Sequence, residues 1–257
     1  MEYGLYYGCG NTFLIGLFKE GINYPEEAKS VCTQYHVDGL ILLIPHPLTM
    51  KIYNADGSEA TMCGNGIRCF AKFAYDYHYL SEKSFDVQTL AGIIPLKIIS
   101  TNPFMVSVNL GRPNFSSKQL GIKTHLPKFI NEIITVNNQN YLTSAVFLGT
   151  DHAVIIGDDY RDAQAISTFP LFTKGINVNF VKIKSRKEIY VKTYERGVGW
   201  TKACGTGSSS SFIVCHKLGL VDNSIEVIVD GGNLLVYLDG DDVILEGPAE
   251  TIKEPKL

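Results

Sequence analysis

The hydrophobic positions of this chain fall mostly into short runs that alternate with polar residues or are rich in β-branched side chains. Most of these runs end at Gly, Pro, Asn or Asp, which is typical of strands separated by turns. The runs predict strands at residues 13–17, 39–44, 50–53, 93–99, 105–110, 145–148, 153–156, 178–181, 188–194, 225–229, 233–237 and 242–245. The pattern therefore indicates a chain dominated by β-structure.

Helical patterns are fewer. Residues 25–35 begin with a proline and two glutamates, a composition that favours a helix N-terminus. Residues 66–79 and 207–217 are apolar stretches that follow glycine-rich turns. Many strands combined with these helices predict an α+β fold built on mixed sheets.

Two turns of nearly identical sequence form an internal repeat. The sequence Cys-Gly-Asn-Gly at 63–66 precedes one apolar helix, and Cys-Gly-Thr-Gly at 204–207 precedes the other. The two cysteines are 141 residues apart (204 minus 63), just over half of the chain. We expect two similar halves, residues 1–112 and 113–249, divided near the Gly-Arg-Pro sequence at 111–113. Whether the tail 250–257 joins the N-terminal half stays open.

Composition and charge narrow the classes of function. Of 257 residues 45% are hydrophobic and 19% are charged, and the formal net charge is -3, which gives no reason to expect nucleic acid or an acidic membrane surface as a partner. The longest apolar stretch, 40–44, is too short to span a membrane. Six cysteines at spacings that fit no zinc site predict free thiols in a reducing cytoplasm and no bound metal.

The repeated turns suggest acid/base chemistry. A cysteine at a helix N-terminus lies beside unsatisfied backbone N–H groups and the positive end of the helix dipole, which favour the thiolate. The same N–H groups can bind a carboxylate. Two such turns, Cys63 and Cys204, could place one sulfur on each side of an amino acid's α-carbon. Inversion of that carbon needs a base on one face and an acid on the other.

Other interpretations of the turns are less favoured. An isolated cysteine beside a helix is usually a small buried apolar residue, but two copies at half-chain spacing favour a catalytic pair. The remaining cysteines, Cys9, Cys32, Cys69 and Cys215, lack the pattern and are expected to fill space. A phosphate-binding loop is disfavoured because no Gly-x-x-x-x-Gly-Lys-Ser/Thr sequence is present.

The chain resembles the diaminopimelate epimerase family. Residues 54–69, Asn-Ala-Asp-Gly-Ser-Glu-Ala-Thr-Met-Cys-Gly-Asn-Gly-Ile-Arg-Cys, are similar to that family's first cysteine signature, and residues 195–207 are similar to its second. Weaker similarity covers nearly the whole chain, at residues 10–13, 89–92, 149–152, 177–180, 231–232 and 247–249.

The resemblance implies a fold of two halves, each a curved mixed sheet around a central helix, with the active site in the cleft between them. It implies epimerisation of LL-diaminopimelate to meso-diaminopimelate, in lysine and peptidoglycan precursor biosynthesis, by the thiols of Cys63 and Cys204 without pyridoxal phosphate or another cofactor. The assembly, a homodimer included, stays open. The substrate-binding residues it implies are Asn11, Asn54, Gly64, Asn65, Asn177, Glu195, Arg196, Gly205 and Thr206, with His152 and Thr150 as supporting residues.

Four positions depart from the family pattern and bear on the substrate. Thr12 stands where the family usually has aspartate, Thr150 and Asp151 replace an Asn-Pro pair, and Trp200 stands where glutamate is common. The first alternative is therefore a cofactor-independent racemase of another amino acid, such as glutamate or histidine. The second is a non-catalytic small-molecule binder of the same fold.

Overall fold

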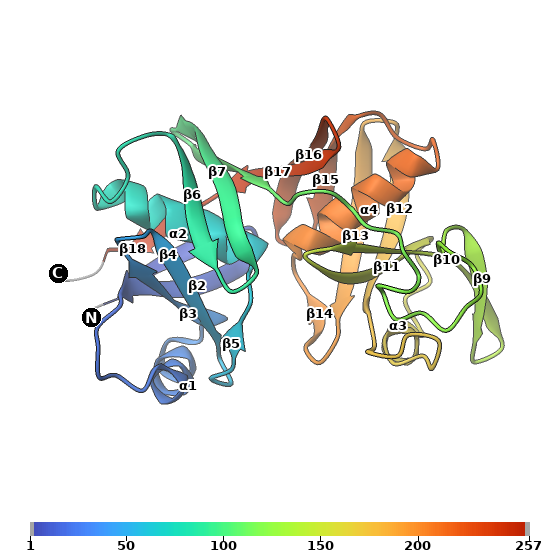
Figure 1. Cartoon of the computed structure of the whole chain (residues 1–257), viewed down its shortest axis with the longest axis horizontal. Coiled ribbons are helices and arrows are strands. Elements are labelled where there is room, and N and C mark those ends of the chain that lie inside the picture. The colour runs from blue at the N-terminus through green and yellow to red at the C-terminus, as the bar shows by residue number, and fades with distance from the viewer. Residues whose placement is uncertain (1–2, 255–257) are drawn as a thin grey trace. The chain divides into compact units, whose positions relative to one another are not determined.

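A computed structural model describes residues 3–254 of the chain (Figure 1). It is a sheet-dominated α+β structure, as the hydrophobic pattern predicts. Within the described residues the helices are α1 (Tyr24–Tyr35), α2 (Gly64–Asp76), α3 (Ala163–Ser167) and α4 (Gly205–Lys217). None of these helices is long and apolar enough to cross a membrane.

The chain divides into two compact units. The first comprises Met1–Asn109 and Glu246–Leu257, and the second comprises Leu110–Leu245. Strand β17 (Asp242–Pro248) runs from the second unit into the first. The first unit is therefore built from both ends of the sequence, while the division into domains 1–112 and 113–249 stays a prediction. The C-terminal tail of the chain, residues 250–257, includes residues 255–257, which lie outside the described part of the chain.

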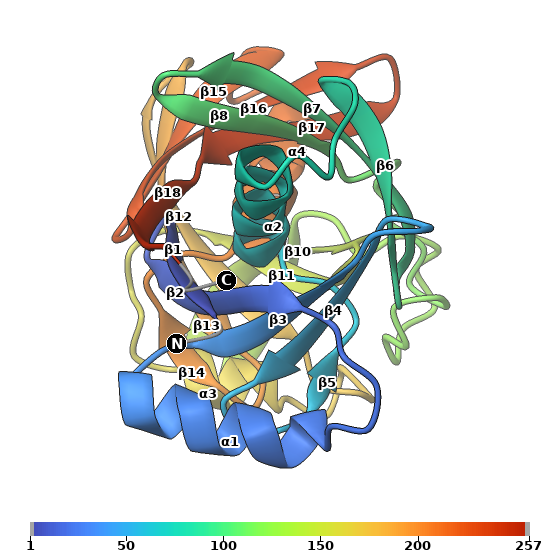
Figure 2. The ribbon, with the colours of Figure 1, turned by 90° about the vertical axis from the view of Figure 1, so that its left-hand side faces the viewer.

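The first unit wraps strands around α2 (Figure 2). Its strands are β1 (Gly4–Gly8), β2 (Asn11–Leu17), β3 (Gly39–Ile44), β4 (Thr49–Asn54), β5 (Glu59–Ala60), β6 (Ser84–Thr89), β7 (Gly92–Thr101), β8 (Phe104–Asn109) and β18 (Glu250–Lys253). Strands β1 and β2 are antiparallel, β2 and β3 are parallel, and β3 and β4 are antiparallel. Strand β4 is parallel to β6, which continues antiparallel into β7 and β8.

The second unit repeats this order around α4. Its strands are β9 (Glu132–Val136), β10 (Gln139–Leu148), β11 (Thr150–Ile156), β12 (Asn177–Ser185), β13 (Glu188–Glu195), β14 (Gly199–Thr201), β15 (Ser224–Val229) and β16 (Gly232–Asp239), together with most of β17. Strands β10 and β11 are antiparallel, β11 and β12 parallel, β12 and β13 antiparallel, and β13 and β15 parallel. The two halves are therefore similar in topology.

Both central helices are buried on nearly every side, which explains their composition. In α2, every residue from Gly64 to Ala71 is buried. In α4 the buried residues include the four consecutive serines 208–211, each fully buried, whose small size lets the surrounding strands approach closely. By contrast, α1 is amphipathic and packs Ala28 and Cys32 into a cluster with Leu40 and Leu42 of β3.

The register of the strands defines equivalent positions in the two halves. Phe13 pairs with Gly39 across two parallel strands, and His152 pairs with Asn177 in the same way. One step further along, Ile41 pairs with Ile52, and Asn179 pairs with Thr193. The equivalent positions are Phe13 and His152, Ile41 and Asn179, Ile52 and Thr193, Asn54 and Glu195, and Arg68 and Ser209.

The predicted elements mostly agree with the structure, with errors at boundaries. The helix predicted at 66–79 starts earlier, at Gly64, and ends at Asp76, because His78 adopts a left-handed conformation (φ 60°) that stops it. The short helix α3 and strands β1, β5, β6, β9, β14 and β18 were not predicted. Strand β6 shows why: among its residues only Val87 is buried, so it lacks a hydrophobic run.

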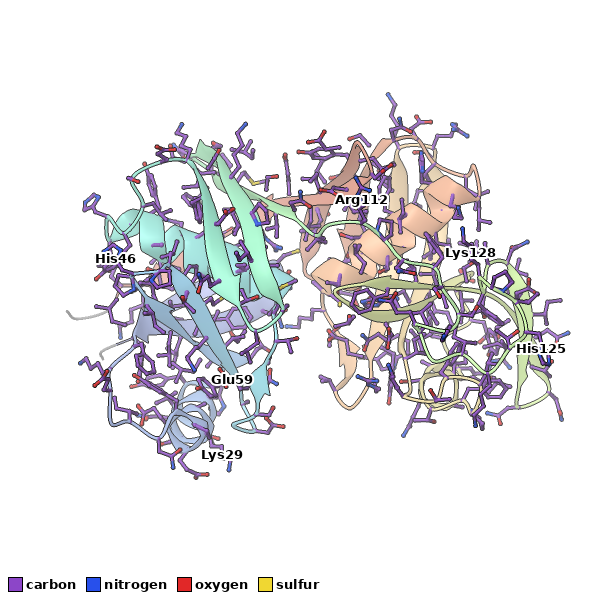
Figure 3. The ribbon with its side chains drawn as sticks, in the orientation of Figure 1. Lys29, His46, Glu59, Arg112, His125 and Lys128 are labelled. Atoms are coloured by element: carbon purple, nitrogen blue, oxygen red, sulfur yellow. The ribbon has the colours of Figure 1, made fainter. Side chains whose placement is uncertain are left out.

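Charged side chains are spread over both units (Figure 3). Lys29 belongs to α1 and pairs with Glu26, while Arg112 belongs to the loop that follows β8 and pairs with Asp241. These ion pairs are exposed and contribute little to stability.

Candidate active site

Cys63 is the N-cap residue of α2. Its backbone is extended (φ -138°, ψ 119°), and its Sγ accepts a hydrogen bond from the Gly66 backbone N–H at 3.4 Å. Its carbonyl oxygen accepts the first helical hydrogen bond, from Ile67 N at 2.8 Å. The sulfur therefore takes the place that a Ser or Asp oxygen usually has at a helix start, where N–H groups and the helix dipole favour an anion.

Cys204 caps α4 in the same way. Its backbone angles are φ -128° and ψ 113°, and its Sγ accepts a hydrogen bond from Gly207 N at 3.3 Å. Its carbonyl accepts from Ser208 N at 2.8 Å. In the described part of the chain none of the six cysteines is in a disulfide, and Cys63 is the most exposed of them, the other five being buried. The repeat seen in the sequence thus corresponds to the same cap in both halves.

In the first unit, hydrogen bonds join Asn65 and Asn11 to a buried arginine. Arg68 Nη2 donates to Asn65 Oδ1 at 3.0 Å. Asn65 Nδ2 donates to Asn11 Oδ1 at 2.7 Å and to the Cys9 carbonyl at 3.3 Å. Because a guanidinium only donates, the orientation of both amides is fixed. The chain of bonds leaves the Asn11 Nδ2 group as a donor for a ligand.

In the second unit, a buried polar network reaches Cys204. His152 Nε2 lies 3.0 Å from Thr206 Oγ1, which lies 3.5 Å from Cys204 Sγ. On its other side, His152 Nδ1 lies 3.1 Å from Asn179 Nδ2, and Thr193 Oγ1 donates to Asn179 Oδ1 at 2.9 Å. We call His152, Asn179 and Thr193 the polar trio. All three are buried.

The geometry of the polar trio selects one tautomer of His152. Asn179 Nδ2 donates to the Ala153 carbonyl at 3.0 Å, and the reverse orientation would bring two oxygens together. The nitrogen of Asn179 therefore faces His152 Nδ1, which must be the acceptor, so the ring proton is on Nε2. Burial lowers the pKa of His152 to about 3, so the ring is neutral at physiological pH.

Glu195 adds a carboxyl group near the second cysteine. Burial raises the pKa of Glu195, while the neighbouring Thr201 and Cys204 side chains act in the opposite direction. Near Cys204 the structure thus holds a carboxyl, a neutral imidazole and hydroxyl groups.

The remaining predicted residues lie close to this network or apart from it. Thr150 Oγ1 lies 2.8 Å from His152 Nε2 and accepts from Asn177 Nδ2 at 3.3 Å. Asn177 Oδ1 accepts from the Arg196 backbone N–H at 2.9 Å, and the exposed Arg196 side chain donates to the carbonyls of residues 174 and 175. Asn54 is exposed and donates to Ser58 Oγ at 2.9 Å.

The positions that depart from the family pattern have local partners. Thr12 N and Oγ1 donate to Asp38 Oδ2 at 2.7 and 3.3 Å. Burial raises the pKa of Asp151, and the nearby Lys174 and Arg196 act in the opposite direction. Trp200 belongs to an aromatic cluster with Tyr160, Phe180 and Tyr194.

Sequence reasoning missed Arg68, Asn179 and Thr193. The signal for Asn179 was the polar alternation in Asn-Val-Asn-Phe at 177–180, inside an otherwise apolar strand. The signal for Arg68 was a charged residue inside an apolar helix, one turn after Gly64. Neither could be assigned partners without the strand register.

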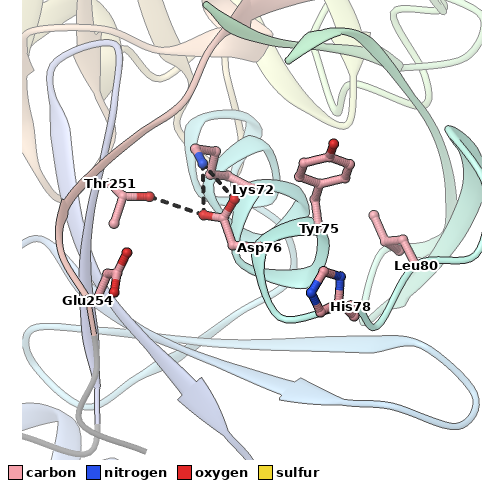
Figure 4. Close-up of a pocket in the computed structure, with 7 residues that line it drawn as sticks. All are labelled: Lys72, Tyr75, Asp76, His78, Leu80, Thr251 and Glu254. Carbon is pink, nitrogen blue, oxygen red and sulfur yellow. Dashed lines mark hydrogen bonds and ion pairs between the residues drawn. The ribbon is translucent and has the colours of Figure 1, made fainter. Parts of the chain in front are cut away.

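A pocket in the first unit lies elsewhere. It is lined by Lys72, Tyr75, Asp76, His78, Leu80, Thr251 and Glu254, around the C-terminal end of α2 (Figure 4). Because Cys63 caps the opposite end of that helix, this pocket is separate from the cysteine turn. Within residues 3–254 no group of three or more His, Cys, Asp and Glu side chains is arranged to hold a metal ion.

Solved structures with the same fold include racemases and epimerases. A phenazine biosynthesis protein of the PhzF family from Bacillus anthracis has a TM-score of 0.72 at 14% identity, covering 98% of this chain and 96% of that one. A hydroxyproline epimerase from Agrobacterium vitis, with bound trans-4-OH-L-proline, has a TM-score of 0.69 at 13% identity, covering 98% and 91%. At such identities the similarity supports the fold of two similar halves.

Sequence comparison identifies the family. A relative from Caldanaerobacter subterraneus subsp. tengcongensis, a diaminopimelate epimerase, is 36% identical over 98% of this chain and 97% of its own length. Another diaminopimelate epimerase, from Methanothermobacter thermautotrophicus, is 38% identical over 88% and 85%. The sequence model of the diaminopimelate epimerase family matches residues 25–116 and 144–252. The chain therefore belongs to the diaminopimelate epimerase family.

Proposed function

We propose that Cys63 and Cys204 are the acid and base of a diaminopimelate epimerase. The protein is an isomerase that converts LL-diaminopimelate to meso-diaminopimelate, the reaction for which its relatives are named. The observation that supports the cysteine assignment is the shared cap: each sulfur accepts the N–H of the third residue of a buried 13-residue helix. A space-filling cysteine needs no such cap.

The proposed reaction is a two-base proton transfer. One cysteine, as thiolate, removes the α-proton, and the electron pair of the broken C–H bond stays on the α-carbon. The other cysteine, as thiol, delivers its proton to the opposite face and becomes the thiolate. Backbone N–H groups at Gly64, Asn65, Gly205 and Thr206 would hold the α-carboxylate and stabilise the developing charge.

The rest of the substrate would be bound by side chains of both halves. Asn11 offers an Nδ2 donor because Asn65 already occupies its oxygen. Arg196 offers a guanidinium suited to the distal carboxylate, and Glu195 a carboxyl suited to an ammonium group. Asn54 and Asn177 complete the proposed set. The hydroxyl of Thr150, which accepts from Asn177, stands where the family usually has an amide.

The proposal includes a reducing compartment, the cytoplasm, because both sulfurs must stay free to exchange protons. A disulfide between them would abolish activity, and a thiol reductant would restore it.

The test is deuterium exchange by single-cysteine variants. Cys63→Ala and Cys204→Ala should each abolish inversion of the α-carbon. Each variant should still exchange the α-hydrogen of one stereoisomer with solvent, because the surviving thiolate removes a proton and returns one to the same face. The two variants should exchange opposite stereoisomers. Chiral separation and mass spectrometry of each stereoisomer in heavy water measure both. Cys32→Ala, in the outer helix α1, is the matched control and should invert at the parental rate. Inversion by either active-site variant at near the parental rate would show that its cysteine is structural.

A further inference from the structure

Arg68 is a fully buried cation at the helix that starts with Cys63. It lies on α2, one turn after Gly64, and its side chain points back toward the helix N-terminus. Nη1 donates to the Gly64 carbonyl at 2.9 Å, Nη2 to Asn65 Oδ1 at 3.0 Å, and Nε to the Pro248 carbonyl at 3.2 Å. Two of these three acceptors belong to the residues directly after Cys63.

The positive charge of Arg68 has no carboxylate partner in the described part of the chain. Its three hydrogen-bond acceptors are neutral oxygens. A buried charge compensated only by neutral groups is costly, and the cost falls when an anion forms nearby. A single arginine therefore attracts negative charge to the first turn of α2.

Three thiols interact with the charge of Arg68: Cys9 most strongly, then Cys69, and then Cys63. Burial raises the pKa of Cys9, and it raises the pKa of Cys69 to about 12, so both thiols stay protonated at neutral pH. Glu250 of β18 lies on the Cys69 side. Cys63 is the remaining thiol, and it is the one that accepts a helix N–H.

Cys204 lies in different electrostatic surroundings. The position equivalent to Arg68 is Ser209, which carries no charge. The Glu195 carboxyl hydrogen-bonds with Cys204 and, when ionised, opposes a second anion beside it. His152 is neutral and reaches Cys204 through Thr206. Of these groups, the ionised Glu195 carboxylate favours the protonated thiol, while the neutral His152 adds no positive charge that would favour a thiolate.

We propose that Arg68 is a positioning residue that holds Cys63 as the thiolate in the resting enzyme, with the proton on Cys204. The inference rests on the proposed function and adds a direction to it. The resting enzyme accepts the stereoisomer whose α-proton faces Cys63. That proton moves to Cys63, the Cys204 proton moves to the carbon, and the enzyme is left as Cys63 thiol and Cys204 thiolate. Proton exchange with solvent restores the resting form.

The first test needs no substitution. Native protein is alkylated with iodoacetamide in short pulses from pH 5 to pH 10, and peptide mass spectrometry gives the rate at Cys63 and at Cys204 separately. Because only the thiolate reacts, we expect Cys63 to reach half of its maximal rate at least about one pH unit below Cys204. Equal midpoints, or a lower midpoint at Cys204, would overturn the inference.

The second test removes the charge. Arg68→Met should raise the Cys63 midpoint by about one pH unit or more and leave the Cys204 midpoint unchanged, whereas Arg68→Lys should retain most of the effect. Lys72→Met is the matched control: it removes a positive charge from the same helix at its other end, where Lys72 pairs with Asp76 (Figure 4). This control should titrate as the native protein does.

The outcomes separate the two proposals. An Arg68→Met protein with an unchanged Cys63 midpoint would refute the role of Arg68, even if both cysteines prove essential for inversion. If Arg68→Met does not fold, the native midpoints and the Arg68→Lys variant still decide the question. Inversion by Cys63→Ala would instead refute the proposed function.

Discussion

The N-terminal turns of α2 and α4 have the same backbone and different surroundings. Both start with a cysteine cap and both have glycine at the third helical position. Behind the first turn lie Phe13, Ile41 and Ile52, which we call the apolar trio. Behind the second lie the polar trio of His152, Asn179 and Thr193, at equivalent positions in the strands.

The two turns share the cysteine cap and differ in the charges and hydrogen bonds around it. The cap that prepares a sulfur is common to both halves, because helix geometry alone provides it. The charge and hydrogen bonds that distinguish two otherwise equivalent thiols come from strand residues and from one helix residue, Arg68 in the first half and Ser209 in the second. The proposed acid and base would thus arise from one repeated structure.

The largest expected loss of stability comes from placing an apolar side chain in the polar trio. Asn179→Leu removes the donor to His152 Nδ1 and to the Ala153 carbonyl, and the acceptor for Thr193. Because His152 Nδ1, the Ala153 carbonyl and Thr193 Oγ1 would each lose a hydrogen-bond partner, we expect the free energy of unfolding to fall by about 3 kcal/mol. Urea unfolding followed by fluorescence of Trp200 measures this, since the chain's single tryptophan lies in the second unit.

The control for this change is Ile41→Val at the equivalent strand position. It removes one methyl group from the apolar trio and should cost about 1 kcal/mol. If Asn179→Leu were no more destabilising than Ile41→Val, the polar trio would not be a connected network.

A somewhat smaller effect is expected from pH. The pKa of His152 is lowered to about 3 in the folded protein and is near 6.5 when unfolded, so the unfolded chain binds the extra proton below pH 6.5. Its contribution is fully present above pH 6.5 and is lost as the pH falls toward 3. Lowering the pH from 7 to 5 should therefore cost about 2 kcal/mol in the free energy of unfolding.

His152→Gln isolates this contribution, because Glu195, whose pKa burial raises, changes stability in the opposite direction as the pH falls. Urea unfolding of both proteins at pH 7, 6 and 5 gives the slopes. The same slope in both would mean that His152 is charged when folded or that its surroundings open to water.

The smallest expected effect compares one substitution at the two turns. A Cβ added to Gly207 would overlap Asn179 Oδ1, which its hydrogen bond holds in place, and would lie 3.0 Å from Thr193 Oγ1. A Cβ on Gly66 would lie 3.0 and 3.2 Å from the terminal methyl groups of Ile41 and Ile52, which can rotate away. Alanine also favours a helix by about 1 kcal/mol over glycine.

We therefore expect Gly207→Ala to lower the free energy of unfolding by about 1.5 kcal/mol and Gly66→Ala to change it by less than about 0.5 kcal/mol. Differential scanning calorimetry of the two variants is the measurement. Equal losses would indicate that the two turns are packed alike.

The strands and helix starts that depend on residues close together in the chain could be predicted from the sequence. Alternating runs located most strands, and the paired Cys-Gly-x-Gly turns located both helix starts, because caps and periodicity depend on neighbours in the sequence. The polar trio could not be predicted, since His152, Asn179 and Thr193 meet only through the register of β11, β12 and β13. Strand β6 was missed because only one of its side chains is buried.

The contacts of the candidate site also differ in whether the sequence could predict them. Contacts within one turn, such as Cys204 with Thr206, follow from spacing. The link from Asn65 to Asn11 joins residues 54 positions apart, and the sequence contains no local sign of it. Partners of this kind require the folded strands.

The return of the chain from the second unit to the first has a consequence for synthesis on the ribosome. Strand β1 pairs with β18, and Arg68 completes its hydrogen bonds only at Pro248, 180 residues later. A nascent chain stopped at residue 245 contains every residue of the second unit but lacks the edge strand and the last arginine contact of the first. The half that is translated first must therefore be finished last, and the surroundings of Cys63 are completed only when translation is nearly over. Pulse proteolysis of released chains that end at Leu245 or continue past Lys253 should detect protection of β1 only in the longer ones.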